Sequence, residues 1–554
     1  MRARQVFLDS LRAHAVRRVF GNPGTTESPL LDALHDYPDI DYVTALHEGI
    51  AVAAASFYAQ ASGTTAVANV HVAPGLGNGL GSLYGALRAR SPMIVTAGQQ
   101  DTRLRLRGPM LGHDLVAMAA PLTKWSVQVE RADEMAPIMA RAFKVANDPP
   151  RGPVFVALPI DVMEQDTDVA APAAPVLYRA PLPEPEGVLA LAELFAAAER
   201  PCLVAGDDVA RRGANEALVE LAECVGAPVY HEGLRQHLSF PNRHPNYGGA
   251  LGFDAAAIRR ALAPFDLIVL VGGPFFEEVW FEAGSAVPDG ARLAQIADDP
   301  HTLARNFPVA AGLLGDLAGT LAALPPVLAE RGGGAFADAA AARNASLRQA
   351  RADALLAWQD RLAADGDALP MPPARALAEL ADALPAGGIV VDEAITAGGA
   401  LLQAFDLADA HDYYGERGGG IGQGIAGALG VKLAHPERPV LAVTGDGSAM
   451  YHIQALWTAA QLDLGILFVV LANREYRVLK HNLDAYRQRF DVPAGNRPYP
   501  HMDLPRLDFV SLAAGMGVAA RRIDDPDRLA EAARQAFASG RPCLLEVVVA
   551  GKDG

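Results

Sequence analysis

Two polar residues follow two apolar segments in the last third of the sequence. Val440–Thr444 is a predicted strand that leads into Gly445-Asp446-Gly447-Ser448, and Ile466–Ala472 is a second predicted strand that leads into Asn473. Asp446 and Asn473 are 27 positions apart, the length of a strand–helix–strand crossover, so both should lie at the carboxyl edge of one parallel sheet. A carboxylate and an amide oxygen are hard ligands that suit Mg²⁺, and the glycines let the backbone approach a phosphate group. The pattern therefore predicts a site for Mg²⁺ and a diphosphate.

An ordinary turn between a strand and a helix is the competing interpretation. In that case Asp446 only caps the following helix and Asn473 only occupies a loop. A Gly-Asp-Gly triplet alone would favour this interpretation. The second strand end, with its Asn at crossover distance, favours the metal site.

The elements that must position these residues belong to three blocks of alternating apolar runs and helical patterns. Val-rich runs bounded by Gly or Pro are typical of buried parallel strands. A Pro-rich connector (Gln165–Glu186) and an Ala-rich one (Gly332–Asp365) separate the blocks. We predict an α/β protein with three doubly wound parallel-sheet domains at residues 1–164, 187–326 and 370–554.

The composition limits the classes of function. The 554 residues include 47 Lys and Arg against 64 Asp and Glu, a formal charge of −17, and 51% are hydrophobic. This balance rules out global disorder and argues against nucleic acid or an anionic membrane as a partner. Three cysteines cannot form a disulfide framework, the N-terminal segment lacks the apolar core of a signal peptide, and no run of 18 apolar residues is present. We therefore expect a soluble, cytoplasmic protein.

The Gly-Asp-Gly triplet and the later Asn resemble the cofactor motif of thiamine diphosphate-dependent enzymes. In that family the metal, Mg²⁺ or Ca²⁺ in its place, is bound by the Asp, the Asn and a backbone carbonyl two residues further on. The resemblance implies Asp446, Asn473 and the main chain of Glu475 as ligands here. Many relatives have Asn-Asn where this chain has Ala472-Asn473. Further cofactor contacts are implied for Gly445, Gly447 and Ser448.

The family also requires a carboxylate for the aminopyrimidine ring of the cofactor. Glu48 follows an apolar strand pattern (DYVTAL) and opens a helical one (AVAAASFYAQ). The resemblance implies that Glu48 interacts with ring nitrogen N1′ and activates the cofactor. Taken alone, Glu48 could equally be a glutamate that interacts with the dipole of its helix.

Four longer segments resemble benzoylformate decarboxylases, within the superfamily of 2-oxo acid decarboxylases and acetolactate synthases. The segments begin at Gly21, His71, Arg417 and Thr444 and cover most of the first and third blocks, with a weaker likeness through the middle one. The resemblance implies that Thr25 binds the substrate carboxylate and that His71 carries protons. It also implies cofactor contacts from the carbonyl of Gly419, the wedge residue Ile421 and the hydroxyl of Thr396.

Two of these features allow another interpretation. His71 ends an apolar strand pattern and could be a buried structural histidine. The run Gly418–Gly422 could be misread as a dinucleotide-binding turn. However, the preceding segment ADAHDYYGER is polar and is not expected to be a buried strand, which disfavours that turn.

Three positions depart from the benzoylformate decarboxylase pattern. Val279 stands where that family has a second histidine, and His113 and His237 are unplaced alternatives for it. Val478 and Asn482 stand where residues that face the substrate side chain are expected, and Asn482 replaces an aromatic residue. An aryl-binding pocket therefore does not follow from the sequence.

The resemblance implies a thiamine diphosphate- and Mg²⁺-dependent carboxy-lyase that converts a 2-oxo acid to an aldehyde, with carboligation to an acceptor aldehyde as a second outcome. An acetolactate synthase-like carboligase is the alternative. A flavin- or nicotinamide-dependent oxidoreductase and a catalytically silent family member are the other classes, although the retained Glu48, Asp446 and Asn473 disfavour a silent protein. Glu48 and the metal motif meet across a subunit interface in this family, which implies a homodimer or homotetramer.

Overall fold

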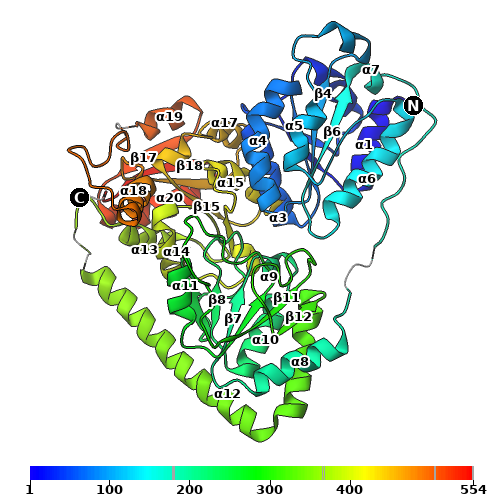
Figure 1. Cartoon of the computed structure of the whole chain (residues 1–554). Coiled ribbons are helices and arrows are strands. Elements are labelled where there is room, and N and C mark those ends of the chain that lie inside the picture. The colour runs from blue at the N-terminus through cyan, green and yellow to red at the C-terminus, as the bar shows by residue number, and fades with distance from the viewer. Residues whose placement is uncertain (178–180, 365, 367, 505–506, 552–554) are drawn as a thin grey trace. The chain divides into compact units, whose positions relative to one another are not determined.

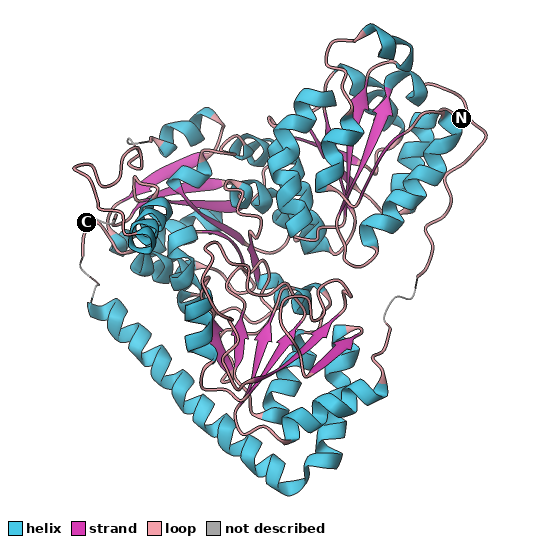
Figure 2. Cartoon of the chain, viewed as in Figure 1, coloured by secondary structure: helices cyan, strands magenta, loops and turns pink. Residues whose placement is uncertain are grey.

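The computed structural model describes residues 1–177, 181–364, 366, 368–504 and 507–551. It contains three sheets, each flanked by helices (Figures 1 and 2). The ladders of the N-terminal, middle and C-terminal sheets are parallel. The predicted α/β class with three parallel-sheet domains is therefore confirmed.

The chain forms two compact units. The N-terminal and C-terminal domains together make the first unit, Met1–Val176, Asp367–Gly398 and Glu416–Gly554. The second unit, Leu177–Gly366 and Gly399–Gly415, contains the middle domain. The domain boundaries predicted above stay predictions.

The sheet of the N-terminal domain has the strand order β2-β1-β3-β4-β6-β5. Its inner strands are buried along their length and are mostly apolar, as expected for a parallel sheet that is covered on both faces. Helices α1 and α6 pack on one side with a common apolar core. The elements are β1 (Arg18–Gly21), β2 (Asp41–Thr44), β3 (Ala66–Val70), β4 (Met93–Gln99), β5 (Trp125–Gln128), β6 (Pro153–Pro159), α1 (Ala3–Ala13), α2 (Ser28–Ala33), α3 (Glu48–Ser62), α4 (Val72–Arg88), α5 (Leu115–Ala119), α6 (Met135–Asn147) and α7 (Ile160–Met163).

The C-terminal domain in the same unit repeats this arrangement with the strand order β13-β15-β16-β18-β17. Strands β15 and β16 pair in parallel, with Gly445 opposite Leu471, so both strands end at one edge, as predicted. The elements are β13 (Ile389–Glu393), β15 (Val440–Gly445), β16 (Ile466–Ala472), β17 (Ala519–Ile523), β18 (Cys543–Val548), α13 (Pro373–Ala383), α15 (Gln423–Ala434), α16 (Asp446–Ala449), α17 (Ala455–Gln461), α18 (Arg477–Phe490), α19 (Phe509–Gly515) and α20 (Leu529–Ser539).

Helices α3 and α15 join the two domains of this unit. They approach so closely that a Cβ atom on Gly427 would lie 2.5 Å from the Phe57 ring, and one on Gly430 would lie 2.0 Å from the Ala54 carbonyl oxygen. Glycine is therefore required at these helical positions in spite of its low helix propensity. This packing fixes the start of α3, which holds Glu48, relative to the start of α15.

The middle domain has a sheet with the strand order β12-β11-β10-β7-β8-β9. Its long helix α12 contains most of the Ala-rich connector and is interrupted at Gly333, where φ is 62°. The elements are β7 (Pro201–Ala205), β8 (Val229–His231), β9 (Tyr247–Ala250), β10 (Leu267–Val271), β11 (Arg292–Ala297), β12 (Ala311–Leu314), α8 (Pro185–Ala196), α9 (Asp208–Arg211), α10 (Asn215–Val225), α11 (Ala255–Leu262) and α12 (Leu317–Ala364).

One expectation about secondary structure is wrong. The segment before the glycine run contains a short buried strand, β14 (Tyr413–Gly415), which follows α14 (Gly398–Ala404). Tyr413 and Tyr414 supply enough apolar surface to bury the strand although its neighbours are polar. In the described part of the chain, no helix is both long enough and apolar enough to cross a membrane.

Candidate active site

The ends of β15 and β16 meet around the carboxylate of Asp446. Its Oδ1 accepts a hydrogen bond from the Gly447 amide at 2.8 Å, and its Oδ2 accepts one from the Arg474 amide at 2.7 Å. Oδ1 of Asn473 accepts a hydrogen bond from the Glu475 amide at 3.1 Å. The structure thus brings Asp446 and Asn473 together at the carboxyl edge of the C-terminal sheet.

The electrostatics of this edge favour a cation. Burial raises the pKa of Asp446, and the negative charge of Glu475 adds to the effect, so a cation beside this carboxylate would stabilise its ionised form. The Glu475 side chain is engaged by Arg477 at 3.0 Å and by Lys480 at 2.5 Å. The Glu475 side chain is therefore already paired with positive charge.

A cavity of about 60 Å³ lies beside these groups. Thr396, Gly445, Gly447, Ser448 and Asn473 are among the residues that line it. A Cβ atom on Gly447 would lie 2.5 Å from the Tyr476 ring, whereas one on Gly445 would meet nothing within 4 Å. Hard oxygen donors beside exposed backbone N–H groups fit a divalent cation and the diphosphate that it would bind.

Glu48 is the first residue of α3 and is buried, with 5% of its surface exposed. The side-chain amides of Asn22 and Asn78 donate to Oε1 at 3.1 Å and to Oε2 at 3.0 Å, respectively. Gly75 leaves the space that the carboxylate needs, because a Cβ atom there would lie 2.8 Å from Oε1. Sequence reasoning missed both asparagines, although each lies inside a segment that carried the family resemblance.

His71 is held by a second buried carboxylate that the sequence did not reveal. Oε2 of Glu27 lies 2.8 Å from Nδ1 of His71 and accepts a hydrogen bond from the Gly24 amide, while Oε1 accepts one from the Gly98 amide. A Cβ atom on Gly24 would overlap the His71 ring at 2.1 Å. The competing interpretation of an inert buried histidine is weakened, because His71 keeps 21% of its side chain exposed.

Thr25 lies at the exposed start of a short 3-10 helix, Thr25–Glu27. Its carbonyl accepts a hydrogen bond from the Ser28 hydroxyl at 2.8 Å. Thr396 has a similar place in the 3-10 helix Ile395–Ala397, where it is exposed and lines the cavity beside Asp446. Both hydroxyls are accessible to a ligand.

Two buried carboxyl groups organise the glycine run. Glu393 accepts hydrogen bonds from the amides of Gly422 and Gly424, and Glu416 accepts one from the Gly419 amide at 2.8 Å. Burial raises the pKa of Glu393 to about 8 and that of Glu416 to about 7. Gly419 has a φ of 72°, which favours glycine.

A histidine connects this run with the start of α3. Nδ1 of His452 lies 2.9 Å from the Gly422 carbonyl oxygen, and its ring is 5.9 Å from that of His47. Burial lowers the pKa of His452, so the neutral ring donates through Nδ1. Glu48, the glycine run with half-buried Ile421, and the Asp446 edge therefore belong to one unit of the chain.

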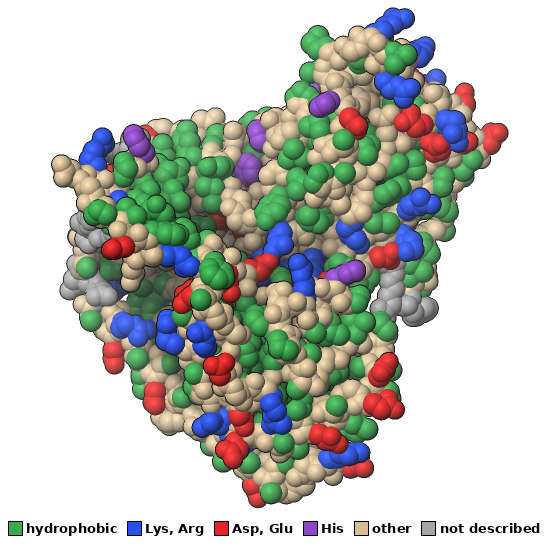
Figure 3. Space-filling model, viewed as in Figure 1, with side chains coloured by type: hydrophobic (Ala, Val, Ile, Leu, Met, Phe, Trp, Pro, Cys, Tyr) green, Lys and Arg blue, Asp and Glu red, His purple; other side chains and the backbone are tan. Residues whose placement is uncertain are grey.

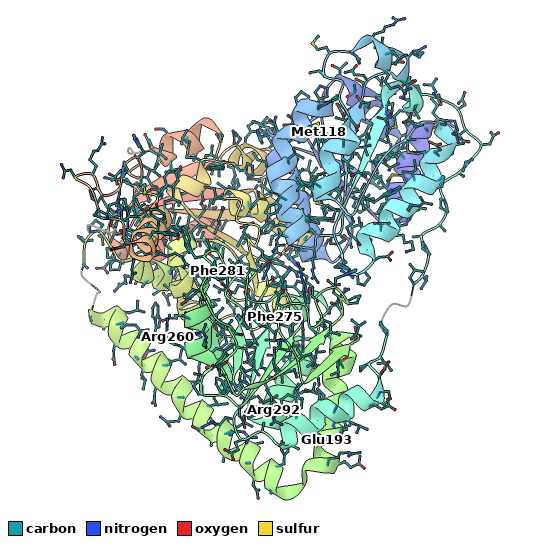
Figure 4. All side chains as sticks on the ribbon, viewed as in Figure 1. Met118, Glu193, Arg260, Phe275, Phe281 and Arg292 are labelled. Carbon is teal, nitrogen blue, oxygen red and sulfur yellow. The ribbon has the colours of Figure 1, made fainter. Side chains whose placement is uncertain are left out.

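The positions that depart from the family pattern do not supply a second histidine. Val279 is 69% exposed in the middle-domain unit. Burial lowers the pKa of His237 to about 3, which makes it unsuitable as a proton carrier near neutral pH. His113 is exposed in the N-terminal domain. Phe275 and Phe281 on either side of Val279 are labelled in Figure 4, the first buried and the second 79% exposed.

The fold and this arrangement agree with the comparison with known families. Residues 1–118 match the thiamine pyrophosphate enzyme N-terminal TPP binding domain, residues 188–324 the central domain, and residues 396–547 the C-terminal TPP binding domain. The chain belongs to the thiamine pyrophosphate enzyme family.

Three individual relatives are similar to this chain over nearly its whole length. A benzoylformate decarboxylase from Pseudomonas aeruginosa is 35% identical over 97% of each chain. A solved thiamine diphosphate-dependent 4-hydroxybenzoylformate decarboxylase from Rhodococcus jostii is 30% identical, covers 100% of both chains and has a TM-score of 0.86. The acetolactate synthase isozyme 3 large subunit of Escherichia coli is 28% identical over 99% of this chain and 95% of its own length. The resemblance to benzoylformate decarboxylases, with acetolactate synthases as further relatives, is thereby confirmed.

Proposed function

We propose that this protein is a thiamine diphosphate- and Mg²⁺-dependent carboxy-lyase that converts a 2-oxo acid to an aldehyde and CO2. Two separate arrangements carry the proposal: Glu48, which two side-chain amides hold, and the sheet edge where Asp446 and Asn473 lie. Family membership supplies the cofactor class.

Each end of the cofactor would have its own set of residues. Asp446, Asn473 and the main chain of Glu475 would bind Mg²⁺. When bound, thiamine diphosphate supplies the electron sink that cleavage of a bond next to a ketone requires. The remaining contacts would come from Thr396, Gly445, Gly447 and Ser448 for the diphosphate, and from the Gly419 carbonyl and the Ile421 side chain for the rings.

Glu48 would hold and move a proton at N1′ of the aminopyrimidine ring. The hydrogen bonds from Asn22 and Asn78 hold both carboxylate oxygen atoms in place. A buried, oriented carboxylate of this kind is suited to general acid–base catalysis.

His71 and Thr25 would act on the substrate. With Nδ1 of His71 directed to Glu27, Nε2 is left to exchange a proton with the reacting group. The exposed hydroxyl of Thr25 would donate to the substrate carboxylate.

Carboligation is the second candidate outcome, and Val279 favours it. An aliphatic residue cannot deliver the proton that completes aldehyde release, so capture by an acceptor aldehyde competes better than it would with a histidine at that position. An acetolactate synthase-like reaction belongs to this alternative. The proposed assembly is a homodimer or homotetramer.

A panel of aryl, aliphatic, branched and anionic 2-oxo acids, assayed for CO2 release with and without an added aldehyde, tests the proposal. We expect release that requires both thiamine diphosphate and Mg²⁺. Product analysis separates free aldehyde from a carboligation product. CO2 release from no member of the panel would contradict a decarboxylase.

A further inference from the structure

The middle domain has a cavity of about 750 Å³ at the amino-terminal edge of its sheet. Pro201, Pro228 and Phe265 lie at or just before the starts of β7, β8 and β10 and form one wall. The second half of α12 and the segment Gly399–Gln403 also line the cavity. Ligands of open α/β sheets ordinarily bind at the opposite, carboxyl edge, so that general rule does not account for this cavity.

Arginine dominates the lining of this cavity, although the chain carries a net charge of −17. Basic side chains gather around a hollow near α12 in the face shown in Figure 3. The arginines that line the cavity are Arg200, Arg235, Arg243, Arg343, Arg351 and Arg361.

Three of these arginines bond only to backbone carbonyl oxygen atoms in the described part of the chain. Arg243 donates to the carbonyls of residues 403 and 404, Arg343 to those of residues 199 and 225, and Arg351 to that of residue 242. Among the described residues, no carboxylate lies within ion-pair distance of these three guanidinium groups. The nearest relevant acid, Asp266, acts on Arg343 only at longer range.

Arg351 has unused donor capacity. Its Nε is buried and has no hydrogen-bond partner among the described residues, and its guanidinium lies 5.2 Å from the centre of the Tyr247 ring. Burial and the positive charge of Arg243 lower the pKa of Arg351. Holding like charges together in a partly desolvated place is costly, and a bound anion would offset that cost.

The cavity also offers flat apolar surface. Tyr230 and Phe265 pack edge to face at 5.9 Å, and Trp358 lies beneath Arg361 at 5.7 Å. Arginine forks over aromatic rings suit a ligand with phosphate or carboxylate groups and an apolar or aromatic body. The volume lies within the range of small-molecule sites.

We propose that this cavity binds a small organic polyanion, with two or more phosphate or carboxylate groups on an apolar or aromatic body. The competing explanation is that the arginines only anchor α12 to the neighbouring loops through carbonyl groups. Anchoring alone predicts no ligand. The proposal does not depend on the proposed catalytic function.

Isothermal titration calorimetry on the full chain tests the proposal. ADP, citrate and inorganic phosphate are titrated at a fixed free Mg²⁺ concentration, with and without saturating thiamine diphosphate. We expect ADP or citrate to bind in the micromolar range under both conditions and inorganic phosphate to bind more weakly. Failure of ADP and citrate to bind at millimolar concentration would overturn the proposal, as would phosphate binding equal to theirs.

Substitutions of arginines that line the cavity test where the probe binds. Arg351→Met and Arg361→Gln should each weaken the affinity for the better probe roughly 10- to 100-fold, because each removes a charge-assisted contact. Arg348→Gln, an exposed position on the same helix outside the cavity lining, should leave it unchanged. Arg361 is exposed and its described side-chain hydrogen bond is to Gln403, so this variant keeps the test valid if Arg351→Met fails to fold. If Arg351→Met and Arg361→Gln both bind the probe as tightly as the wild type does, the probe binds at another site. Loss of binding in Asp446→Asn would also assign the probe to another site.

Discussion

The Asp446 edge and the middle-domain cavity are both proposed to hold an anionic group. They differ in the charge of the side chains around that group. At the Asp446 edge, carboxylates, an amide oxygen and backbone N–H groups surround a small cavity. In the middle domain, arginines surround a cavity of about 750 Å³. We propose that an anion at the first place is held through a metal ion, whereas six arginines line the second place.

This difference separates two kinds of recognition. A divalent cation and a set of backbone groups select one geometry of oxygen atoms, which suits a cofactor that must be held in a single position. Guanidinium groups on long side chains accept several arrangements of phosphate or carboxylate. We therefore expect the first region to suit a fixed cofactor and the second to suit a ligand that exchanges.

Replacement of Glu48 tests the first region most severely. Glu48→Gln should lower kcat roughly 100- to 10,000-fold, because the variant loses the proton-transfer group and keeps the shape. Thiamine diphosphate affinity, followed by quenching of intrinsic fluorescence, should change little. Retention of a tenth of the wild-type turnover would remove Glu48 from the proposed role.

Replacement of Asp446 tests the need for a metal. Asp446→Asn should weaken Mg²⁺-dependent binding of thiamine diphosphate by about 100-fold, because it removes the negative charge of a proposed metal ligand. The measurement is a Mg²⁺ titration at fixed cofactor concentration. Asp524→Asn, at an exposed position of the same domain, is the matched control. Unchanged Mg²⁺ affinity would remove Asp446 from the proposed metal site.

Replacement of Glu27 should have a smaller effect. Glu27→Gln keeps the size of the side chain but loses the charge opposite Nδ1 of His71, so the ring is held less firmly. We expect kcat to fall about tenfold, with KM for the 2-oxo acid and cofactor affinity nearly unchanged. An equal rise in KM would instead indicate a general disturbance of the pocket. Full activity would show that His71 does not need this carboxylate.

The sequence predicts the parts of the site that follow from regular spacing. Asp446 and Asn473 could be placed at one edge because a strand–helix–strand crossover fixes where consecutive parallel strands end. Glu48 could be identified through the family resemblance, because its position at a helix start after a strand fits the carboxylate that the family requires. Polar contacts between loops have no such period, and for that reason Asn22, Asn78 and Glu27 emerged only from the structure.

The arginine-lined cavity of the middle domain was even harder to predict from the sequence. Its arginines are spread from position 200 to position 361, with no common spacing, and net charge gives the opposite expectation. The polar neighbours of β14 likewise concealed a buried strand, because two tyrosines suffice to cover three residues. Local sequence patterns predicted the three sheets. The arginine-lined cavity and the burial of β14 depend on packing between residues far apart in the sequence.

A pH series compares the carboxyl groups of Glu393 and Glu416, which titrate, with the arginines of the middle-domain cavity, which do not. Their pKa values are raised by burial to about 8 and about 7, above the ordinary values of exposed glutamates, so the folded protein holds protons that the unfolded chain has released. The free energy of unfolding of the cofactor-free protein should therefore fall as pH rises from about 4.5 to about 8. Arginines do not titrate in this range, so the cavity of the middle domain contributes nothing to the slope.

The midpoint of urea unfolding at pH 5.5 and pH 8.5 measures this effect. We expect a lower midpoint at the higher pH, and a smaller difference between the two pH values in Glu393→Gln, because the amide cannot ionise. Glu330→Gln, an exposed change on α12, should keep the full difference. A midpoint that does not fall with pH, or that falls equally in Glu393→Gln, would show that ionisation of Glu393 does not destabilise the folded protein.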